Sequence, residues 1–243
     1  MLTWVYKSIN IDMSKKPLFL VYIDHPMCSI DCADGIAEVL NRSGLYEARF
    51  IGPDSPDRTP LSKEILEEAD CVVFGGGLGD SDQFDDKLLD YRSLIRNYVA
   101  KGGRYLGICM GSYFAGYHYF DLLANNTKAV QYVTRPDSTV KRETYDVVTI
   151  SWEGKDKTLY FHDGAAFVPS KGFKTISGDV VAKYQNGDAA ALIQDYKKGR
   201  VAVVGPHPEA HSWWFYSQSR IHNRWHDCVH HDLALDLVSR LMQ

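Results

Sequence analysis

One cysteine of this 243-residue chain stands in a setting that suits a nucleophile. Cys109 lies in the segment 107–111 (GICMG), with a glycine two residues away on each side, between an apolar run and a helical pattern. In a nucleophile elbow, a tight strand-to-helix turn strains the backbone at the nucleophile, and small neighbours prevent collisions. The helix N-terminus also favours the reactive thiolate. The segment therefore predicts a nucleophilic thiol, and a buried structural cysteine is the alternative if the elbow stands alone.

Partner groups for such a thiol occur in the segment 205–209 (GPHPE), which directly follows the apolar strand predicted over 201–204. The imidazole of His207 can take the thiol proton, and the carboxylate of Glu209 can turn back to orient the ring and stabilise its charged form. The alternative is a loop histidine between two prolines that has no function. Together with the elbow, the segment predicts a triad of Cys109, His207 and Glu209.

The glycine loop 75–79 also follows a predicted strand. It lacks the Lys-Ser/Thr ending of a phosphate-binding P-loop and does not continue into a dinucleotide-binding fingerprint. An oxyanion hole is the better interpretation, with one backbone N–H from this loop and one from Met110 directed at the charge of a tetrahedral intermediate. Such donors contribute about 2.7 to 4 kcal/mol each.

Two aspartates are further candidates for contact with a substrate. Asp80 follows the glycine loop and could bind a substrate amine or ribose, although an aspartate in this position more often caps the next helix. Asp163 follows a strand predicted over 159–161 and is a candidate lining residue, as is His162 before it, with plain turn residues as the alternative.

No metal site is expected. The histidines of the C-terminal region include a series at i, i+4 and i+8 (His222, His226 and His230), but they lack the closely spaced Cys/His pairs of structural zinc sites. Cys28 and Cys32 are separated by three residues rather than two, so they do not form a Cys-x-x-Cys redox motif and are interpreted as structural.

Alternating strands and helices must position these groups. Apolar runs predict strands over 18–23, 47–51, 71–74 and 104–108, separated by helical patterns over 33–40, from 62, and over 88–99. Further strands are predicted over 130–133, 147–150, 159–161, 180–184, 189–194 and 200–204, with helices returning from about 212. The pattern predicts a doubly wound α/β fold with a mostly parallel central sheet. Because loops at the carboxyl ends of parallel strands share one crevice, the glycine loop and Cys109 are expected side by side.

Composition limits the function classes. A hydrophobic content of 45% is enough for one substantial core, and a net charge of −4 gives no reason to expect nucleic acid as a partner. No apolar run approaches the length of a membrane span, and five irregularly spaced cysteines indicate reduced thiols. With no signal peptide recognisable at the start, a cytoplasmic protein is expected. Residues 1–16 are interpreted as an N-terminal appendage and residues 17–243 as a single domain.

The elbow, the glycine loop and the segment 205–209 together resemble the class I glutamine amidotransferase superfamily. Within it, the segments 105–115 (YLGICMGSYFA) and 161–164 (FHDG) are most similar to the N-terminal domain of biotin-protein ligases and its free-standing bacterial relatives. The resemblance implies a flavodoxin-like three-layer sandwich, the same triad, and oxyanion donors near Gly76, Gly77 and Met110.

The sequence departs from the superfamily directly after the elbow. Glutamine amidotransferases usually carry His-Gln there, which shapes the glutamine pocket, whereas this chain has Ser112-Tyr113. The departure argues against glutamine as the substrate. With no synthetase domain recognisable in the sequence, an amidotransferase role would require a separate partner.

The expected function is a cysteine-dependent hydrolase or amidotransferase-like enzyme that acts on a C–N amide bond of a small molecule or peptide. It needs no cofactor, and neither nucleic acid nor a membrane is an expected partner. A homodimer and a separate partner enzyme both stay open. The alternatives are a non-catalytic ligand-binding or regulatory module related to the ligase N-terminal domain, and a redox-responsive thiol protein without turnover.

Overall fold

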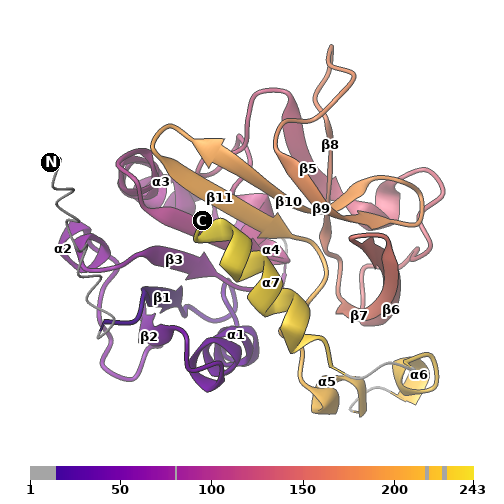
Figure 1. Cartoon of the computed structure of the whole chain (residues 1–243), viewed down its shortest axis with the longest axis horizontal. Coiled ribbons are helices and arrows are strands. Elements are labelled where there is room, and N and C mark those ends of the chain that lie inside the picture. The colour runs from indigo at the N-terminus through magenta and orange to yellow at the C-terminus, as the bar shows by residue number, and fades with distance from the viewer. Residues whose placement is uncertain (1–14, 80, 217–218, 226–228) are drawn as a thin grey trace, which may run out of the picture.

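The computed structural model describes residues 15–79, 81–216, 219–225 and 229–243 (Figure 1). Most of the predicted N-terminal appendage lies outside the described residues, as do Asp80 and His226. The strands are β1 (Leu18–Tyr22), β2 (Glu47–Ile51), β3 (Cys71–Phe74), β4 (Arg104–Ile108), β5 (Thr127–Gln131), β6 (Asp146–Trp152), β7 (Lys155–Phe161), β8 (Ala165–Pro169), β9 (Asp179–Tyr184), β10 (Ala189–Tyr196) and β11 (Gly199–Val204). The α-helices are α1 (Ile30–Arg42), α2 (Lys63–Glu67), α3 (Asp85–Ala100), α4 (Met110–Phe114), α5 (Ser212–Tyr216), α6 (Ser219–His222) and α7 (His231–Leu241), and short 3-10 helices span Ser81–Phe84 and Tyr132–Thr134.

The strands form one large mixed sheet in the order β2-β1-β3-β4-β11-β10-β9-β6-β7, with β8 paired to β10 and β5 paired to β8. The pairings from β2 to β11 are parallel, and the remaining pairings are antiparallel. The chain segment between β4 and β11 supplies β5 to β10, which pair only in antiparallel fashion, and β5 to β9 lie on the right-hand side in Figure 1. The sheet is therefore not wholly parallel, because this β-rich segment joins the parallel strands through β10.

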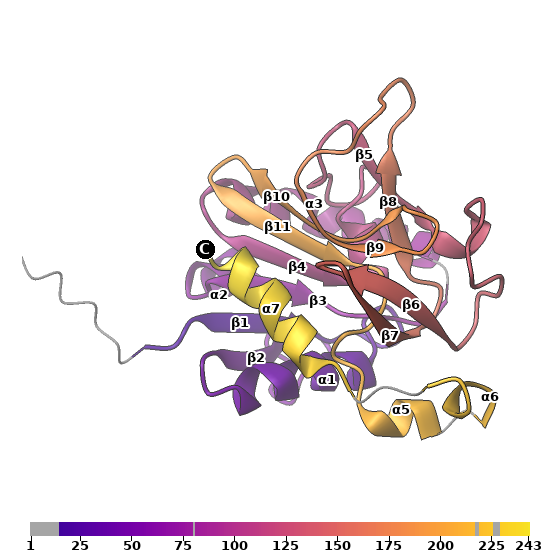
Figure 2. The same cartoon turned by 45° about the vertical axis from the view of Figure 1, so that its right-hand side comes forward.

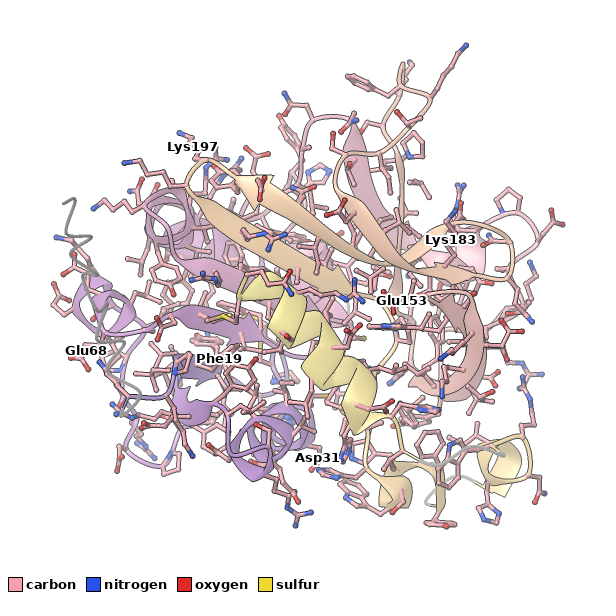
Figure 3. The ribbon with its side chains drawn as sticks, viewed as in Figure 1. Phe19, Asp31, Glu68, Glu153, Lys183 and Lys197 are labelled. Atoms are coloured by element: carbon pink, nitrogen blue, oxygen red, sulfur yellow. The ribbon has the colours of Figure 1, made fainter. Side chains whose placement is uncertain are left out.

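Helices cover both faces of the parallel strands. α1 and α7 pack together on one face, where Phe19, labelled in Figure 3, is completely buried in the core that they share with β1. α3 and α4 contribute to a second core on the opposite face, where Leu88 and Phe114 pack against Phe74 and its neighbours. Figure 2 shows α7 lying across the sheet close to α1. Strands buried on both faces read as continuous apolar runs, which is why β1 and β3 were recognisable.

The predicted strands over 47–51, 71–74 and 104–108 have the predicted bounds. Two local predictions were wrong. The strand β8 was missed because its two alanines have low strand propensity, and its pairing with β5 and β10 overrides that preference. The predicted strand over 130–133 ends at Gln131 and continues as a 3-10 helix.

Among the residues that the structure describes, no helix is long and apolar enough to span a membrane.

Candidate active site

Cys109 occupies the turn between β4 and α4, with φ of 51° and ψ of −107°. Few non-glycine residues adopt a positive φ, and such strain concentrates at functional sites. A Cβ atom on Gly107 would lie 2.5 Å from the carbonyl oxygen of Gly111, and one on Gly111 would collide with the carbonyl oxygen of Phe74. Both glycines of the elbow are therefore required by close backbone contacts.

The glycine loop and the elbow lie side by side, as expected from the topology. β3 and β4 are parallel neighbours, with Phe74 opposite Gly107. The amide of Gly111 donates a hydrogen bond of 3.1 Å to the carbonyl oxygen of Gly75. The two loops thus form one edge of the same crevice.

His207 follows β11, the other parallel neighbour of β4. Its amide donates to the carbonyl oxygen of Tyr160 at 2.9 Å, and its ring lies against the rings of Tyr160 and Trp214, with centroids 5.7 and 5.5 Å away. Its ring lies close enough to Cys109 for the charge of the thiolate to raise the pKa of the imidazole. Nδ1 lies 2.8 Å from Oε1 of Glu209. The structure thus brings together the three residues that the sequence nominated for the triad.

The charge state of His207 follows from these neighbours. Burial alone lowers the pKa of the imidazole, but the negative charges of Glu209 and Cys109 and the hydrogen bonds to both outweigh it, so the pKa lies well above its usual value. The surroundings therefore favour the protonated form of the His207 ring.

Glu209 is completely buried. A Cβ atom on Gly35 of α1 would lie 3.2 Å from its Cγ, so the helix approaches the carboxylate closely at this glycine. Its Oε1 faces His207, whereas Oε2 is buried without a hydrogen-bond partner among the described residues. The carboxylate therefore keeps unused capacity to accept hydrogen bonds or to bind a cation.

The oxyanion donors that the sequence nominated lie beside the turn that carries Cys109. The glycine loop is held by hydrogen bonds of 2.8 Å from the amide of Ser29 to the carbonyl oxygen of Gly76 and from the amide of Leu78 to that of Pro26. Within the described part of the chain, the amides of Gly77 and Met110 have no hydrogen-bond acceptor. Free N–H groups of this kind are what an oxyanion hole requires.

A cavity of about 1120 Å³ opens beside the elbow, and its lining includes Gly77, Cys109, Met110 and Asp163. Asp163 is fixed in it, because its Oδ2 accepts a hydrogen bond of 2.9 Å from Gln131 and its carbonyl oxygen accepts one of 2.9 Å from the Tyr113 hydroxyl. Asp80, the remaining nominated residue, lies outside the described residues.

Two further residues lie at the site, namely His162, which the sequence offered beside Asp163 as a lining candidate, and Cys32, which the sequence did not nominate. The carbonyl oxygen of His162 accepts a hydrogen bond of 3.3 Å from the Cys109 thiol. Burial, and then the charge of His207, lower the pKa of the His162 ring to about 4. The Cys32 side chain lies against the glycine loop, and burial raises the pKa of its thiol to about 12 despite the opposing charge of His207.

A signal for Cys32 was present in the sequence. The residue lies in the first turn of the helix that follows β1, and β1 is itself a parallel strand whose carboxyl end faces the same crevice. The side chain of Ser29 caps this helix by accepting a hydrogen bond from the Cys32 amide at 3.3 Å. The prediction that Cys32 is only structural took account of its spacing from Cys28 and not of its place at the start of a helix that borders the crevice.

Two sequence comparisons match biotin-protein ligases. Residues 59–131 match the family model described as the N-terminal region of biotin-protein ligase. The biotin-protein ligase of Schizosaccharomyces pombe is 29% identical over 190 residues, which cover 68% of this chain and 29% of the ligase. The chain thus matches less than a third of that relative's length.

Solved structures show the same fold at lower sequence identity. A cytoplasmic protein from Salmonella typhimurium superimposes with a TM-score of 0.54 at 15% identity, covering 93% of this chain and 99% of that protein. A glutamine amidotransferase from Methylobacillus flagellatus superimposes with a TM-score of 0.51 at 14% identity, covering 84% of this chain and 74% of that one. At these identities the likeness concerns the fold alone.

Proposed function

We propose, from a glutamine-amidotransferase-like fold that is related to the N-terminal domain of biotin-protein ligases, that this chain is a cysteine-dependent hydrolase or amidotransferase-like enzyme acting on a C–N amide bond. One observation carries the proposal. His207 lies close enough to Cys109 for the two to interact electrostatically, and Nδ1 of His207 lies 2.8 Å from the buried carboxylate of Glu209. A nucleophile, a base and an orienting group in this series can perform acyl transfer.

In the first half of the reaction, the Cys109 thiolate attacks the amide carbonyl carbon, and the π electrons move onto the carbonyl oxygen. The amides of Gly77 and Met110, with that of Gly76 nearby, stabilise this oxyanion. His207 gives its proton to the amide nitrogen, the C–N bond breaks, the amine leaves, and a thioester on Cys109 remains.

In the second half, water or an acceptor amine attacks the thioester carbonyl while His207 takes its proton. The C–S bond then breaks and returns the thiolate of Cys109. Glu209 holds the ring in one orientation and stabilises its charged form through both halves. His207 therefore alternates between acid and base, as its position between thiol and carboxylate allows.

The cavity supports a polar amide substrate, either a small molecule or a peptide segment. Its volume of about 1120 Å³ exceeds the ~300–1,000 Å³ of ordinary small-molecule pockets. Carboxylates of Asp82, Glu143 and Asp163 line it, which favours a substrate that carries hydrogen-bond donors or positive charge. Asp80 remains a proposed rim residue. Transfer to an amine, as opposed to hydrolysis, would use a second copy of the chain or a separate enzyme as partner.

The test is an amide screen with the purified protein, in which released amine and a thioester adduct on Cys109 are followed by mass spectrometry. Wild-type protein should form the adduct and release amine, and Cys109→Ala should do neither. Cys71→Ala is the matched control, because Cys71 is a buried thiol at the start of β3, opposite the end that carries the glycine loop. Turnover that persists in Cys109→Ala would refute the mechanism.

A non-catalytic ligand-binding module is the second candidate, and the residues after the elbow favour it. The Ser112 hydroxyl donates to the carbonyl oxygens of Gly107 and Val204, and the Tyr113 hydroxyl donates to that of Asp163, so neither side chain has a free donor for the carbonyl oxygen of a glutamine amide. Saturable binding of amides by wild type and Cys109→Ala alike, without any adduct, would support this candidate over the enzyme.

We also propose the domain extent, the detailed fold and the cellular location of the chain. Residues 17–243 would form one domain, with a doubly wound, flavodoxin-like sandwich around the parallel strands. A cytoplasmic location suits an enzyme whose nucleophile must stay reduced.

A further inference from the structure

Three potential metal ligands lie close together next to the proposed catalytic cysteine, Cys109. Cys32, His207 and Glu209 each offer one donor atom, and these atoms all lie within 4.8 Å of one another. Cys32 comes from the first turn of α1, whereas the other two follow β11. The tertiary fold alone creates this cluster, because the sequence separates its members widely.

The glycine loop keeps the cluster compact. A Cβ atom on Gly76 would lie 2.8 Å from the sulfur of Cys32 and 2.7 Å from Cε1 of His207. The sulfur and the ring therefore face the same bare backbone from two sides. Any larger residue at position 76 would force them apart.

The donor set matches the preferences of zinc. Zn²⁺ binds thiolate at about 2.3 Å and imidazole or carboxylate at about 2.0–2.2 Å, and sites with three protein ligands leave a fourth position for water. Tetrahedral donors at those distances are about 3.3–3.7 Å apart. The donors here lie within 4.8 Å of one another, so they would have to adjust around the ion, and the hydrogen bond between His207 and Glu209 would be replaced by bonds to the metal. A thiolate and a carboxylate would also neutralise the two charges of the ion in a buried setting.

A second observation points to a cation at the same place. Oε2 of Glu209 is a completely buried carboxylate oxygen with no hydrogen-bond partner in the described part of the chain. Buried carboxylate oxygens ordinarily have partners, and each exception calls for an explanation. A metal ion bound to Glu209 would supply the missing interaction.

Two members of the cluster, Cys32 and His207, line a second cavity. A cavity of about 410 Å³ is lined by Cys32 and His207 and by Asp31, Tyr160 and Trp214. Asp31, at the start of α1, is labelled in Figure 3 on the side of the molecule where α5 lies. This cavity shares Gly77 and His162 with the larger one beside Cys109, and it opens onto Cys32 and His207.

We propose that Cys32, His207 and Glu209 form a zinc site that shares two residues with the triad, and that zinc bound there inhibits the protein reversibly. Metal binding is inferred from the positions of the three donor atoms and from the unpartnered Oε2 of Glu209, and it does not depend on the proposed function. The inhibition rests on the proposed function, because a His207 ring bound to zinc cannot exchange protons with Cys109. Chelation would restore the free ring.

The experiment measures zinc binding to the full-length protein by competition with a chromophoric chelator. Wild type should bind zinc with a stoichiometry of one, and Cys32→Ala should bind it more weakly by over about 100-fold, since even loss of an outer partner of a metal site can cost that much. Cobalt-substituted wild type should show a thiolate-to-metal charge-transfer band that Cys32→Ala lacks. Cys32→Ser provides a second variant of similar volume should the alanine form be unstable.

Two control variants test whether zinc binds at other places on the protein. Cys109→Ala should keep the zinc affinity of the wild type, because its thiol is not one of the three ligands. His222→Ala should keep it too, because His222 is an exposed histidine of α6. Zinc affinity that is unchanged in Cys32→Ala, or that is lost in His222→Ala instead, would overturn the site.

The inhibitory consequence has its own readout. Zinc should slow the alkylation of Cys109 by iodoacetamide in the wild type and leave it unchanged in Cys32→Ala, with the chelator restoring the wild-type rate. If no amide is ever turned over but zinc binding depends on Cys32, the proposed function fails and the metal site stands. If turnover is found and zinc leaves Cys109 alkylation unaffected, the inhibitory role fails.

Discussion

Nδ1 of His207 and Oε1 of Glu209 are 2.8 Å apart, and both side chains are almost fully removed from solvent. Burial alone would keep the imidazole neutral. The buried carboxylate reverses this and, together with Cys109, raises the pKa of His207 well above its ordinary value. The readiness of Cys109 to react therefore depends on Glu209, a residue that we do not expect to touch the substrate.

The variant Glu209→Gln tests this dependence. The glutamine side chain can still form a hydrogen bond but carries no negative charge, so the pKa of His207 should fall and its protonated form should be less favoured. We expect turnover to drop by about 10² to 10⁴, the upper end being the loss caused by the equivalent change in a serine protease triad. Iodoacetamide labelling of Cys109 at neutral pH should slow in parallel. Labelling as fast as in the wild type would show that Glu209 does not act through the ring.

Gly76→Ala should disturb the site by steric contact. Its Cβ atom would lie 2.7 Å from Cε1 of His207 and 2.8 Å from the Cys32 sulfur, closer than real side chains tolerate. We expect slower labelling of Cys109 and a loss of about 1–3 kcal/mol in the free energy of unfolding, measured by urea denaturation. Gly75→Ala is the matched control, since its nearest neighbour would be Cβ of Cys32 at an ordinary 3.5 Å. Equal effects of the two variants would contradict the steric explanation.

Ser112→Ala should lower stability. The buried Ser112 hydroxyl donates to the carbonyl oxygens of Gly107 and Val204 and accepts from the Val204 amide, so it ties the elbow to β11. Its removal leaves buried backbone groups short of a partner, at a cost of about 1–3 kcal/mol in the free energy of unfolding. Ser170→Ala, whose hydroxyl forms no hydrogen bond within the described residues, should change stability little. An unchanged urea midpoint for Ser112→Ala would refute the expected role.

The ring of His162 should make the fold sensitive to mild acid. Burial, followed by the charge of His207, lowers its pKa to about 4, whereas an unfolded histidine has a pKa of about 6.5. Between these values the unfolded chain binds a proton that the folded chain does not, so its stability contribution is full above about pH 6.5 and is lost as the pH falls towards 4.

His162→Gln should reduce that loss. The measurement is urea denaturation at about pH 7 and about pH 5 for wild type and variant, with the difference between the two pH values as the readout. His118→Gln, which replaces an exposed histidine, should leave the pH dependence of the wild type unchanged. A pH dependence as steep in His162→Gln as in the wild type would assign the acid sensitivity to other groups.

The sequence by itself was sufficient to predict the parallel strands and to nominate the three residues of the triad. β1 and β3 are covered on both faces, so their residues are continuously apolar, and the loops that follow parallel strands must open at one edge of the sheet. This argument predicted that the glycine loop would lie beside Cys109, and the bond from Gly111 to Gly75 confirms it. The conformation of Cys109 itself was readable from its flanking glycines.

Only the tertiary structure decided which side chains surround the triad. The antiparallel strands between β4 and β11 carry weak local signals, as the missed strand β8 shows, and their order depends on long-range pairing. His162 reaches Cys109 from the end of β7, and Cys32 reaches His207 from α1, across separations that no local pattern encodes. Spacing along a chain predicts periodic burial and turns, whereas the meeting of residues from distant segments is fixed by packing of the whole sheet and its helices.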